Sequence, residues 1–252
     1  MATKQLAGPV ELLKSSWEIL KARWRTFVAI QLVPVLILIP VGIIAVLVFG
    51  VYGVSKSVAD GHVPTDLAGF ITAFKVIAPV ALVMGLISGL LQLWANLALI
   101  FVIKDWKEDI GFKGAFRLSW KILRSYLWVS FLVGLAVMGG LILLVIPGLI
   151  FGVLLAFSGY ILIDQGVKGK AALKASMALV KGRFWAVVGR IAVIAILGLI
   201  LTSVGEYISK AWENTPMAWI GVLGTFVVSF MWTPFAVAYA WLLYSSLKST
   251  KN

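Results

Sequence analysis

The sequence predicts an all-α fold, a polytopic membrane bundle of six transmembrane helices. Its hydrophobic fraction is 62% and its charged fraction is 13%, whereas soluble domains have about 45–50% and about 25%. Several uncharged segments exceed about 18 residues, the length that indicates a membrane-spanning helix. Their apolar residues are continuous rather than alternating, which excludes a β-barrel. We therefore expect a single integral membrane domain over residues 1–252.

The predicted spans are the charge-poor segments of the chain. No cleavable signal peptide is expected before them, because residues 1–25 carry five basic residues and no apolar core. The six spans are 27–54, 75–103, 127–146, 148–163, 184–203 and 218–244.

One long uncharged run requires a fold-back. It extends over 39 residues between Arg124 and Asp164, and as one helix it would measure about 58 Å. The hydrocarbon core of a bilayer is only about 30 Å thick. Pro147 lacks a backbone donor and Gly148 tolerates turn dihedrals, so a turn is expected there. The two arms are short, and a re-entrant hairpin is the alternative to two full crossings. The spacing Gly148-x3-Gly152 is also typical of close helix contacts.

If the chain crosses the membrane six times, its positive charges are distributed unequally between the two sides of the membrane. Both termini and the segments 104–124 and 168–190 share one side, which holds 19 of the 22 Lys and Arg residues. The other side holds Lys56, Lys75 and Lys210. Because Lys and Arg accumulate in cytoplasmic loops, both termini are expected to be cytoplasmic.

Three segments on the predicted cytoplasmic side resemble one another, and we call them the basic stretches. They are residues 14–27, 117–130 and 174–187, and they align without gaps. Each has a basic residue first, then Ser16, Ser119 or Ser176, and each ends in an aromatic cluster at the start of a predicted span. The pattern predicts three tandem units, each an amphipathic interfacial helix followed by a transmembrane hairpin.

Basic side chains recur at helical spacing in and just before these stretches, beside apolar faces. This pattern is typical of helices that lie in the membrane interface. Two interpretations are open: the cations only set topology and anchor the bundle, or they bind anionic phospholipid or a membrane or cytoplasmic protein partner. Nucleic acid is not an expected partner. The candidate surface comprises Lys14, Lys21, Lys113, Arg117, Lys121, Arg124, Lys170, Lys174 and Lys181.

Polar residues inside predicted spans are the other candidate site. Gln92 and Asn96 are four residues apart on the second span, Gln31 lies in the first, and Arg190 lies in the fifth. Helix-to-helix hydrogen bonds explain the amides, and snorkelling to the interface explains Arg190. A substrate pathway is the alternative interpretation.

The residue inventory argues against catalysis, a metal site or a cofactor. The chain has no cysteine and one histidine, His62, which lies in a polar loop beside Asp60 and Asp66. A thiolate site and a multi-histidine metal site are therefore excluded. Phosphate-binding, metalloprotease and nucleophile-elbow motifs do not occur in the sequence.

Residues 146–189 resemble a family of bacterial polytopic proteins. The shared features include the Ile146-Pro147-Gly148 turn, Asp164, Lys181-Gly182 and Phe184-Trp185. Members of this family occur alone or as the membrane domain ahead of some glycerophosphoryl diester phosphodiesterases. The resemblance implies a multi-pass protein of the cytoplasmic (inner) membrane. It implies no activity, because the chain contains no soluble hydrolase domain.

These observations favour a non-enzymatic membrane protein whose basic helices engage anionic lipid or a partner. A transporter or lipid-handling permease that uses Gln92, Asn96 and Arg190 is the second hypothesis. The membrane subunit of a phosphodiesterase system is the third.

Overall fold

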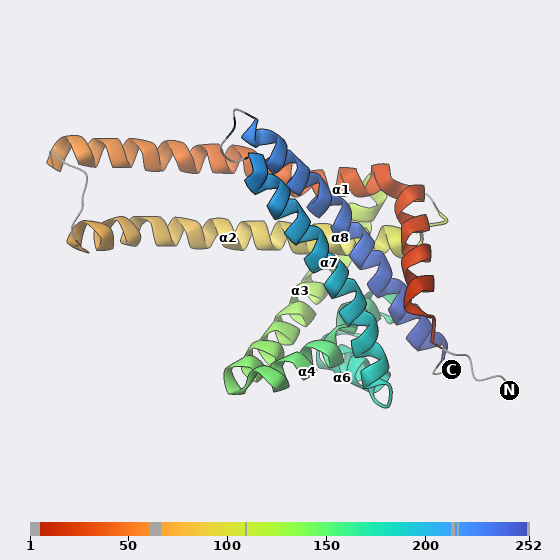
Figure 1. Ribbon diagram of the computed structural model, residues 1–252. Coiled ribbons are helices and arrows are strands. Elements are labelled where there is room, and N and C mark those ends of the chain that lie inside the picture. Colours follow the sequence, from red (N-terminus) through yellow and green to blue (C-terminus); the bar gives the residue numbers. More distant parts are fainter. Residues whose placement is uncertain (1–5, 61–66, 109, 213–214, 216, 251–252) are drawn as a thin grey trace. The chain divides into compact units, whose positions relative to one another are not determined.

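The prediction of an all-α fold is confirmed by the computed structural model (Figure 1). It describes residues 6–60, 67–108, 110–212, 215 and 217–250, which form eight helices and no strand. Six helical segments in the described residues are long and apolar enough to cross a membrane. The helices are α1 (Pro9–Asp60), α2 (Leu67–Lys104), α3 (Gly111–Leu143), α4 (Val145–Leu155), α5 (Ser158–Gln165), α6 (Gly169–Val180), α7 (Phe184–Trp212) and α8 (Ala218–Ser249).

The chain separates into two compact units. The smaller one, residues 29–95, consists of the greater part of α1 and α2, which run in opposite directions (Figure 1). The loop between these helices, with His62 and Asp66, lies outside the described residues. The larger unit contains residues 1–28 and 96–252. It therefore includes all three basic stretches.

The predicted fold-back between Arg124 and Asp164 is present, but its position differs from the prediction. The break between α3 and α4 is at Leu144, whose backbone is extended at φ −164° and ψ 150°. Pro147 and Gly148 instead lie in the first turn of α4. Proline is well accommodated there, because the amides of a first helical turn have no intrahelical partner. Pro147 therefore helps to begin the second arm and does not form the turn itself.

Glycines bring the two arms of this hairpin into direct backbone contact. A Cβ placed on Gly140 would lie 2.8 Å from Cα of Gly148, and one placed on Gly148 would lie 2.8 Å from the amide nitrogen of Leu141. Neither position has room for a side chain. Gly152, the other member of the predicted spacing, has no described atom within 4 Å of such a Cβ. The close contact therefore pairs Gly148 with Gly140 and does not use Gly152.

Helices α7 and α8 form a second tightly packed hairpin (Figure 1). Gly198 of α7 faces the indole of Trp232, with 2.9 Å between a Cβ placed there and Cζ2 of the ring. Near the other end of the pair, a Cβ on Gly221 of α8 would lie 2.6 Å from Cα of Ser209. Small residues allow the helices to approach, which increases dispersion contacts where lipid offers no hydrophobic driving force.

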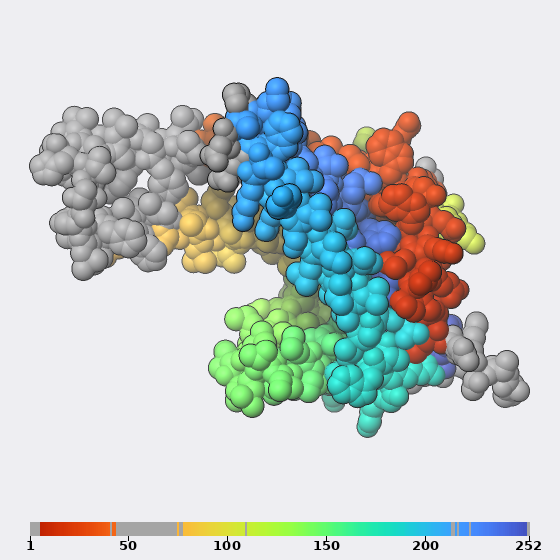
Figure 2. Space-filling model, viewed as in Figure 1, coloured from red at the N-terminus to blue at the C-terminus, as the bar shows by residue number. Residues whose placement is uncertain are grey.

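The amino-terminal part of α1 packs against this hairpin (Figure 2). Trp17 and Leu20 line an apolar groove of about 360 Å³ together with residues of α7 and α8. Helix α1 bends after this part, at Arg23, whose backbone is non-helical at φ −126° and ψ 21°. The first basic stretch is therefore divided at Arg23 between two helical segments.

Candidate functional site

All nine cations of the candidate surface are exposed. They lie on the amino-terminal part of α1, on the first half of α3, and on α6 with the residue that follows it. Three tryptophans beside the first two groups, Trp17, Trp24 and Trp120, are also exposed. Lys21 lies 5.9 Å from the ring centroid of Trp17, and Arg25 lies 5.6 Å from that of Trp24. Exposed tryptophans beside cations are typical of the level of lipid headgroups.

The three basic stretches bury equivalent positions. Ser16, Ser119 and Ser176 are fully buried, although serine is usually exposed. The residues four positions earlier, Leu12, Ala115 and Ala172, are buried as well. A four-residue spacing defines one helix face. Each stretch therefore has one buried face, while its candidate cations are exposed.

The three serines satisfy their hydrogen bonds in different ways. Ser16 and Ser119 donate to carbonyls of their own helices, those of Leu12 at 2.6 Å and Phe116 at 2.9 Å. Ser176 donates to the carbonyl of Leu154 at 2.7 Å and accepts from the amide of Phe157 at 3.2 Å. Those two groups belong to the break between α4 and α5. Ser176 therefore joins α6 to the end of the second hairpin arm.

The second basic stretch differs from the prediction of a separate interfacial helix. Residues 117–130 are continuous with the apolar segment that follows, because α3 is one helix from Gly111 to Leu143. The other two stretches do separate from their spans, at Arg23 and at the 181–183 turn. Tyr126 occupies the corresponding position of the second stretch. Its ring packs 3.1 Å from a Cβ placed on Gly159, inside a continuous helix.

Arg23 and Arg183 occupy the same position of their stretches and make similar hydrogen bonds. Nε of Arg23 donates to the carbonyl of Trp106 at 2.9 Å, just beyond the end of α2. Nη2 of Arg183 donates to the carbonyl of Thr250 at 3.0 Å, just beyond the end of α8. Carbonyls at a helix carboxyl end lack intrahelical partners, and a cation there also interacts favourably with the helix dipole. Each arginine therefore joins a basic stretch to the end of a long helix.

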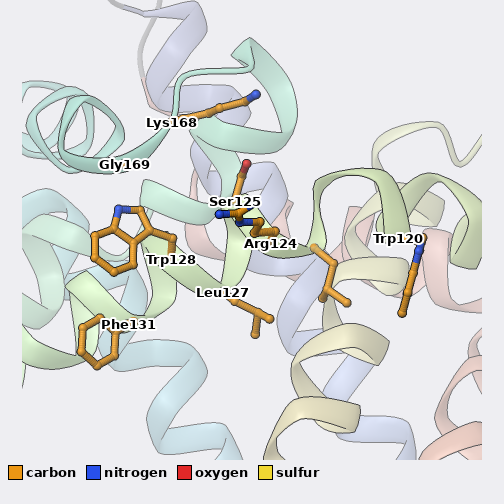
Figure 3. A pocket seen from close by; sticks show the side chains of 9 residues that line it. Trp120, Arg124, Ser125, Leu127, Trp128, Phe131, Lys168 and Gly169 are labelled. Carbon is orange, nitrogen blue, oxygen red and sulfur yellow. The ribbon is translucent and has the colours of Figure 1, made fainter.

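A cavity of about 1210 Å³ lies between α3 and the start of α6 (Figure 3). Two of its lining residues are cations, Arg124 and Lys168, and no carboxylate lines it. Arg124 belongs to the candidate surface, whereas Lys168 does not. The full lining is Trp120, Leu123, Arg124, Ser125, Leu127, Trp128, Phe131, Lys168 and Gly169.

Arg190 is held by the chain's amino-terminal segment. Its Nε donates to the carbonyl of Ala7 at 2.9 Å and its Nη2 donates to that of Leu6 at 3.3 Å. Nη1 donates to Ala186 of the same helix at 2.9 Å. The amide of Ala7 in turn donates to the hydroxyl of Ser246 on α8 at 3.0 Å. Carbonyl oxygens therefore satisfy the guanidinium, which has a structural role in this arrangement.

The predicted intramembrane amides are divided between the two compact units. Gln31 and Gln92 belong to the smaller unit, and Asn96 belongs to the larger unit with Arg190. Gln31 is buried, whereas Gln92 is exposed. The side-chain oxygen of Asn96 is buried without a hydrogen-bond partner among the described residues. Neither Asn96 nor Arg190 lines the cavity beside Arg124 or the apolar groove beside Trp17.

A polar network around Asp164 was missed by the sequence analysis. Oδ2 of Asp164 accepts hydrogen bonds from the Tyr244 hydroxyl at 2.7 Å and from Lys248. Gln165 donates to the Tyr244 hydroxyl at 3.0 Å, and Lys104 donates to the carbonyl of Ile163 at 3.3 Å. In the sequence, Asp164 is recognisable only as the acidic residue that ends a long uncharged segment. Its partners are about 80 residues away, so spacing alone could not identify them.

Within the described residues, no group of three or more His, Cys, Asp or Glu side chains is placed to hold a metal ion. Comparison with protein-family models, curated proteins and solved structures found no match to this chain.

Proposed function

We propose that this protein is a non-enzymatic, multi-pass membrane protein whose basic stretches bind anionic phospholipid at the cytoplasmic surface. The observation that carries the proposal is the exposure of all nine candidate cations beside exposed tryptophans. Opposite faces of the same helices are buried in the protein, so the cations are directed away from the core. Lipid phosphates are the anions that a membrane supplies in greatest number at this level.

The expected free energy of lipid binding is the sum of many weak electrostatic contacts. Each Lys or Arg near an anionic surface contributes about 1 kcal/mol, and salt screens the attraction within a Debye length. Removal of several cations is therefore expected to reduce the enrichment of anionic lipid around the protein. The effect is expected to diminish as ionic strength rises.

The proposal is tested by a variant that lacks six cations outside the cavity. The substitutions are Lys14→Gln, Lys21→Gln, Lys113→Gln, Arg117→Gln, Lys170→Gln and Lys174→Gln. The protein is extracted with its surrounding lipid in polymer-bounded particles, and the ratio of phosphatidylglycerol to zwitterionic lipid is measured by mass spectrometry. We expect the six-residue variant to lose phosphatidylglycerol enrichment.

The matched control is Lys75→Gln with Lys210→Gln. Both lysines are exposed, but they belong to the side that the charge distribution assigns to the exterior. The control is expected to keep the enrichment of the unmodified protein. An unchanged lipid ratio in the six-residue variant would refute lipid binding by the basic stretches.

We also propose that both termini face the cytoplasm and that the protein resides in the bacterial cytoplasmic membrane. The support is the distribution of Lys and Arg, of which 19 of 22 share one side of six crossings. The absence of cysteine provides a clean background for labelling. Single cysteines at Lys107 and Val167 should react only with reagents that enter the cell, whereas one at Lys210 should react with an impermeant reagent.

We infer three tandem units within this architecture. Two observations support the inference: equivalent serines are buried in all three stretches, and Arg23 and Arg183 make similar bonds beyond α2 and α8. The second unit departs from the pattern, since Tyr126 replaces the arginine and α3 is unbroken. Without an arginine at this position, the second unit lacks the hydrogen bond that accompanies the bend in the other two units.

A permease is the alternative proposal. The buried oxygen of Asn96 supports it, because that oxygen has no hydrogen-bond partner in the described part of the chain. The bonds of Arg190 to Leu6 and Ala7 give that residue a structural role instead. The resemblance of residues 146–189 to phosphodiesterase membrane domains supports a third proposal, a membrane subunit beside a separate hydrolase. Recovery of phosphodiesterase activity with the purified protein tests it.

A further inference from the structure

One side of the cavity beside Arg124 is a single stripe of α3. Trp120, Arg124 and Trp128 follow one another at four-residue spacing, and Leu127 and Phe131 continue the stripe. Lys168 and Gly169, at the start of α6, form the other side. Figure 3 shows Ser125 directed toward Lys168, with Trp128 and Phe131 to one side of Arg124 and Trp120 to the other.

The charged part of the cavity lining is suited to a phosphate. Two cations from different elements line the cavity, and no acidic residue does. The side chains of Arg124 and Lys168 are exposed rather than paired inside the protein core. A guanidinium and an ammonium together match the charge and the several acceptor oxygens of a phosphate group.

The aromatic part of the cavity lining is suited to an acyl chain. Trp128 and Phe131 stack with their ring centroids 5.8 Å apart, and both are exposed. They follow Arg124 in the direction of the apolar part of α3. Seven residues separate Arg124 from Phe131, which corresponds to about 10 Å along the helix. A soluble phosphate compound would leave these rings without a partner.

Packing beneath the cavity fixes its two sides relative to each other. Val129 of α3, Leu162 of α5 and Ala172 of α6 form one buried apolar cluster. Gly169 enters α6 with φ +58°, a backbone conformation that glycine adopts readily. A Cβ placed on Gly169 would lie 3.7 Å from Nε1 of Trp128, so the chain passes close to the indole. The backbone segments that carry the two cations are thereby held relative to each other before any ligand arrives.

We propose that this cavity binds one acidic phospholipid, with its phosphate between Arg124 and Lys168 and an acyl chain along Trp128 and Phe131. This inference rests on the proposed function, because it assigns one discrete lipid site within the basic surface. It adds Lys168 to the cations inferred from the sequence. It also distinguishes Arg124 from the eight other candidate cations, which contribute through diffuse attraction.

The test compares two double variants that remove the same charge. Arg124→Gln with Lys168→Gln removes both cations of the cavity, whereas Lys113→Gln with Lys174→Gln removes two exposed cations that do not line it. Each protein is purified in detergent, and phosphatidylglycerol is titrated in while native mass spectrometry counts the molecules bound. We expect one tightly bound lipid, whose affinity falls about tenfold or more in the cavity variant only.

Two further measurements identify the ligand and the role of charge. Arg124→Lys with Lys168→Arg keeps both charges and is expected to retain the bound lipid. Excess soluble glycerol 3-phosphate is expected to leave the lipid in place, because it cannot contact Trp128 and Phe131. Thermal unfolding of each variant confirms that the exposed substitutions leave the fold intact.

Equal loss of lipid in the two double variants would overturn the discrete site while leaving diffuse binding by the basic stretches intact. Displacement of the lipid by glycerol 3-phosphate would overturn the acyl-chain half of the site. Unchanged affinity in the cavity variant would also refute the proposal. Unchanged phosphatidylglycerol enrichment in the six-residue variant would instead refute the proposed function of the basic stretches.

Discussion

The hydroxyl of Tyr244 donates a 2.7 Å hydrogen bond to Oδ2 of Asp164, joining residues 80 positions apart in the chain. Tyr244 is buried, and its ring lies among those of Phe157, Tyr160 and Trp241. Asp164 also accepts from Lys248, one helical turn beyond Tyr244 on α8. The end of the second predicted hairpin is thereby attached to the last helix of the chain.

Tyr244→Phe is expected to destabilise the protein more than Lys248→Gln does. Phenylalanine keeps the ring contacts and removes only the buried hydroxyl, at a cost of about 1–2 kcal/mol in the free energy of unfolding. Lys248 is 41% exposed, so solvent screens its ion pair and we expect a loss below about 1 kcal/mol. Thermal unfolding in detergent, followed by tryptophan fluorescence, measures both. A larger loss in Lys248→Gln would contradict this ranking.

Ser176→Ala is expected to cost more stability than Ser16→Ala. The hydroxyl of Ser176 serves one carbonyl and one amide at the break between α4 and α5, and both would become unpaired. Such a loss costs about 1–3 kcal/mol per buried group. The Ser16 hydroxyl bonds only to a carbonyl in its own helix, which retains its helical partner.

Ser249→Ala provides the baseline for this comparison, because Ser249 is exposed and bonds only within its own helix. The melting temperatures of the three variants should fall in the order Ser176, Ser16, Ser249, from lowest to highest. An equal effect at Ser16 and Ser176 would show that the bridge between α6 and the break contributes nothing.

Gly140→Ala and Gly139→Ala are expected to have opposite effects. A methyl group on Gly140 would lie 2.8 Å from the backbone of Gly148, so α3 and α4 would have to separate, at about 1–3 kcal/mol. Gly139 has no described atom within 4 Å of such a methyl. Alanine there is expected to stabilise α3 by up to about 1 kcal/mol through helix propensity.

The same experiment can report on the hairpin itself. Cysteines introduced at Leu141 and Leu149, in a chain that otherwise has none, provide a pair whose crosslinking rate follows the approach of the two arms. Gly140→Ala should lower that rate, whereas Gly139→Ala should leave it unchanged. Similar crosslinking in both variants would show that the contact between Gly140 and Gly148 does not determine the packing.

Arg190→Gln is expected to release the amino-terminal segment from α7. The guanidinium bonds to the carbonyls of both Leu6 and Ala7, and glutamine is too short to replace both bonds. A single cysteine introduced at Ala7 should therefore react faster with a thiol reagent in the Arg190→Gln background. Arg183→Gln is the control, because Arg183 bonds to Thr250 rather than to Leu6 or Ala7. Faster labelling in the control as well would indicate general loosening.

The hydrophobic pattern determined the class of fold because it is a local property. Backbone N–H and C=O groups in lipid have no water to bond, so they must pair within the protein. Long, continuously apolar segments are therefore helices wherever they lie in the bundle. The exposure of Lys113, Arg117 and Lys121 follows from the same local spacing. Length also requires the fold-back. Its break lies at Leu144 and not at Pro147, because proline suits a first helical turn as well as a loop.

Contacts between residues far apart in the sequence could be identified only from the tertiary structure. Arg124 was a candidate from its spacing, but Lys168 joined it only because Val129, Leu162 and Ala172 pack α3 against α6. Asp164 was visible as the end of an uncharged run, whereas Tyr244 and Lys248 became its partners through the packing of α5 and α8. Periodicity along one helix specifies which face is polar and which is apolar. It does not specify which other helix meets that face, since this depends on side-chain shapes over the whole bundle.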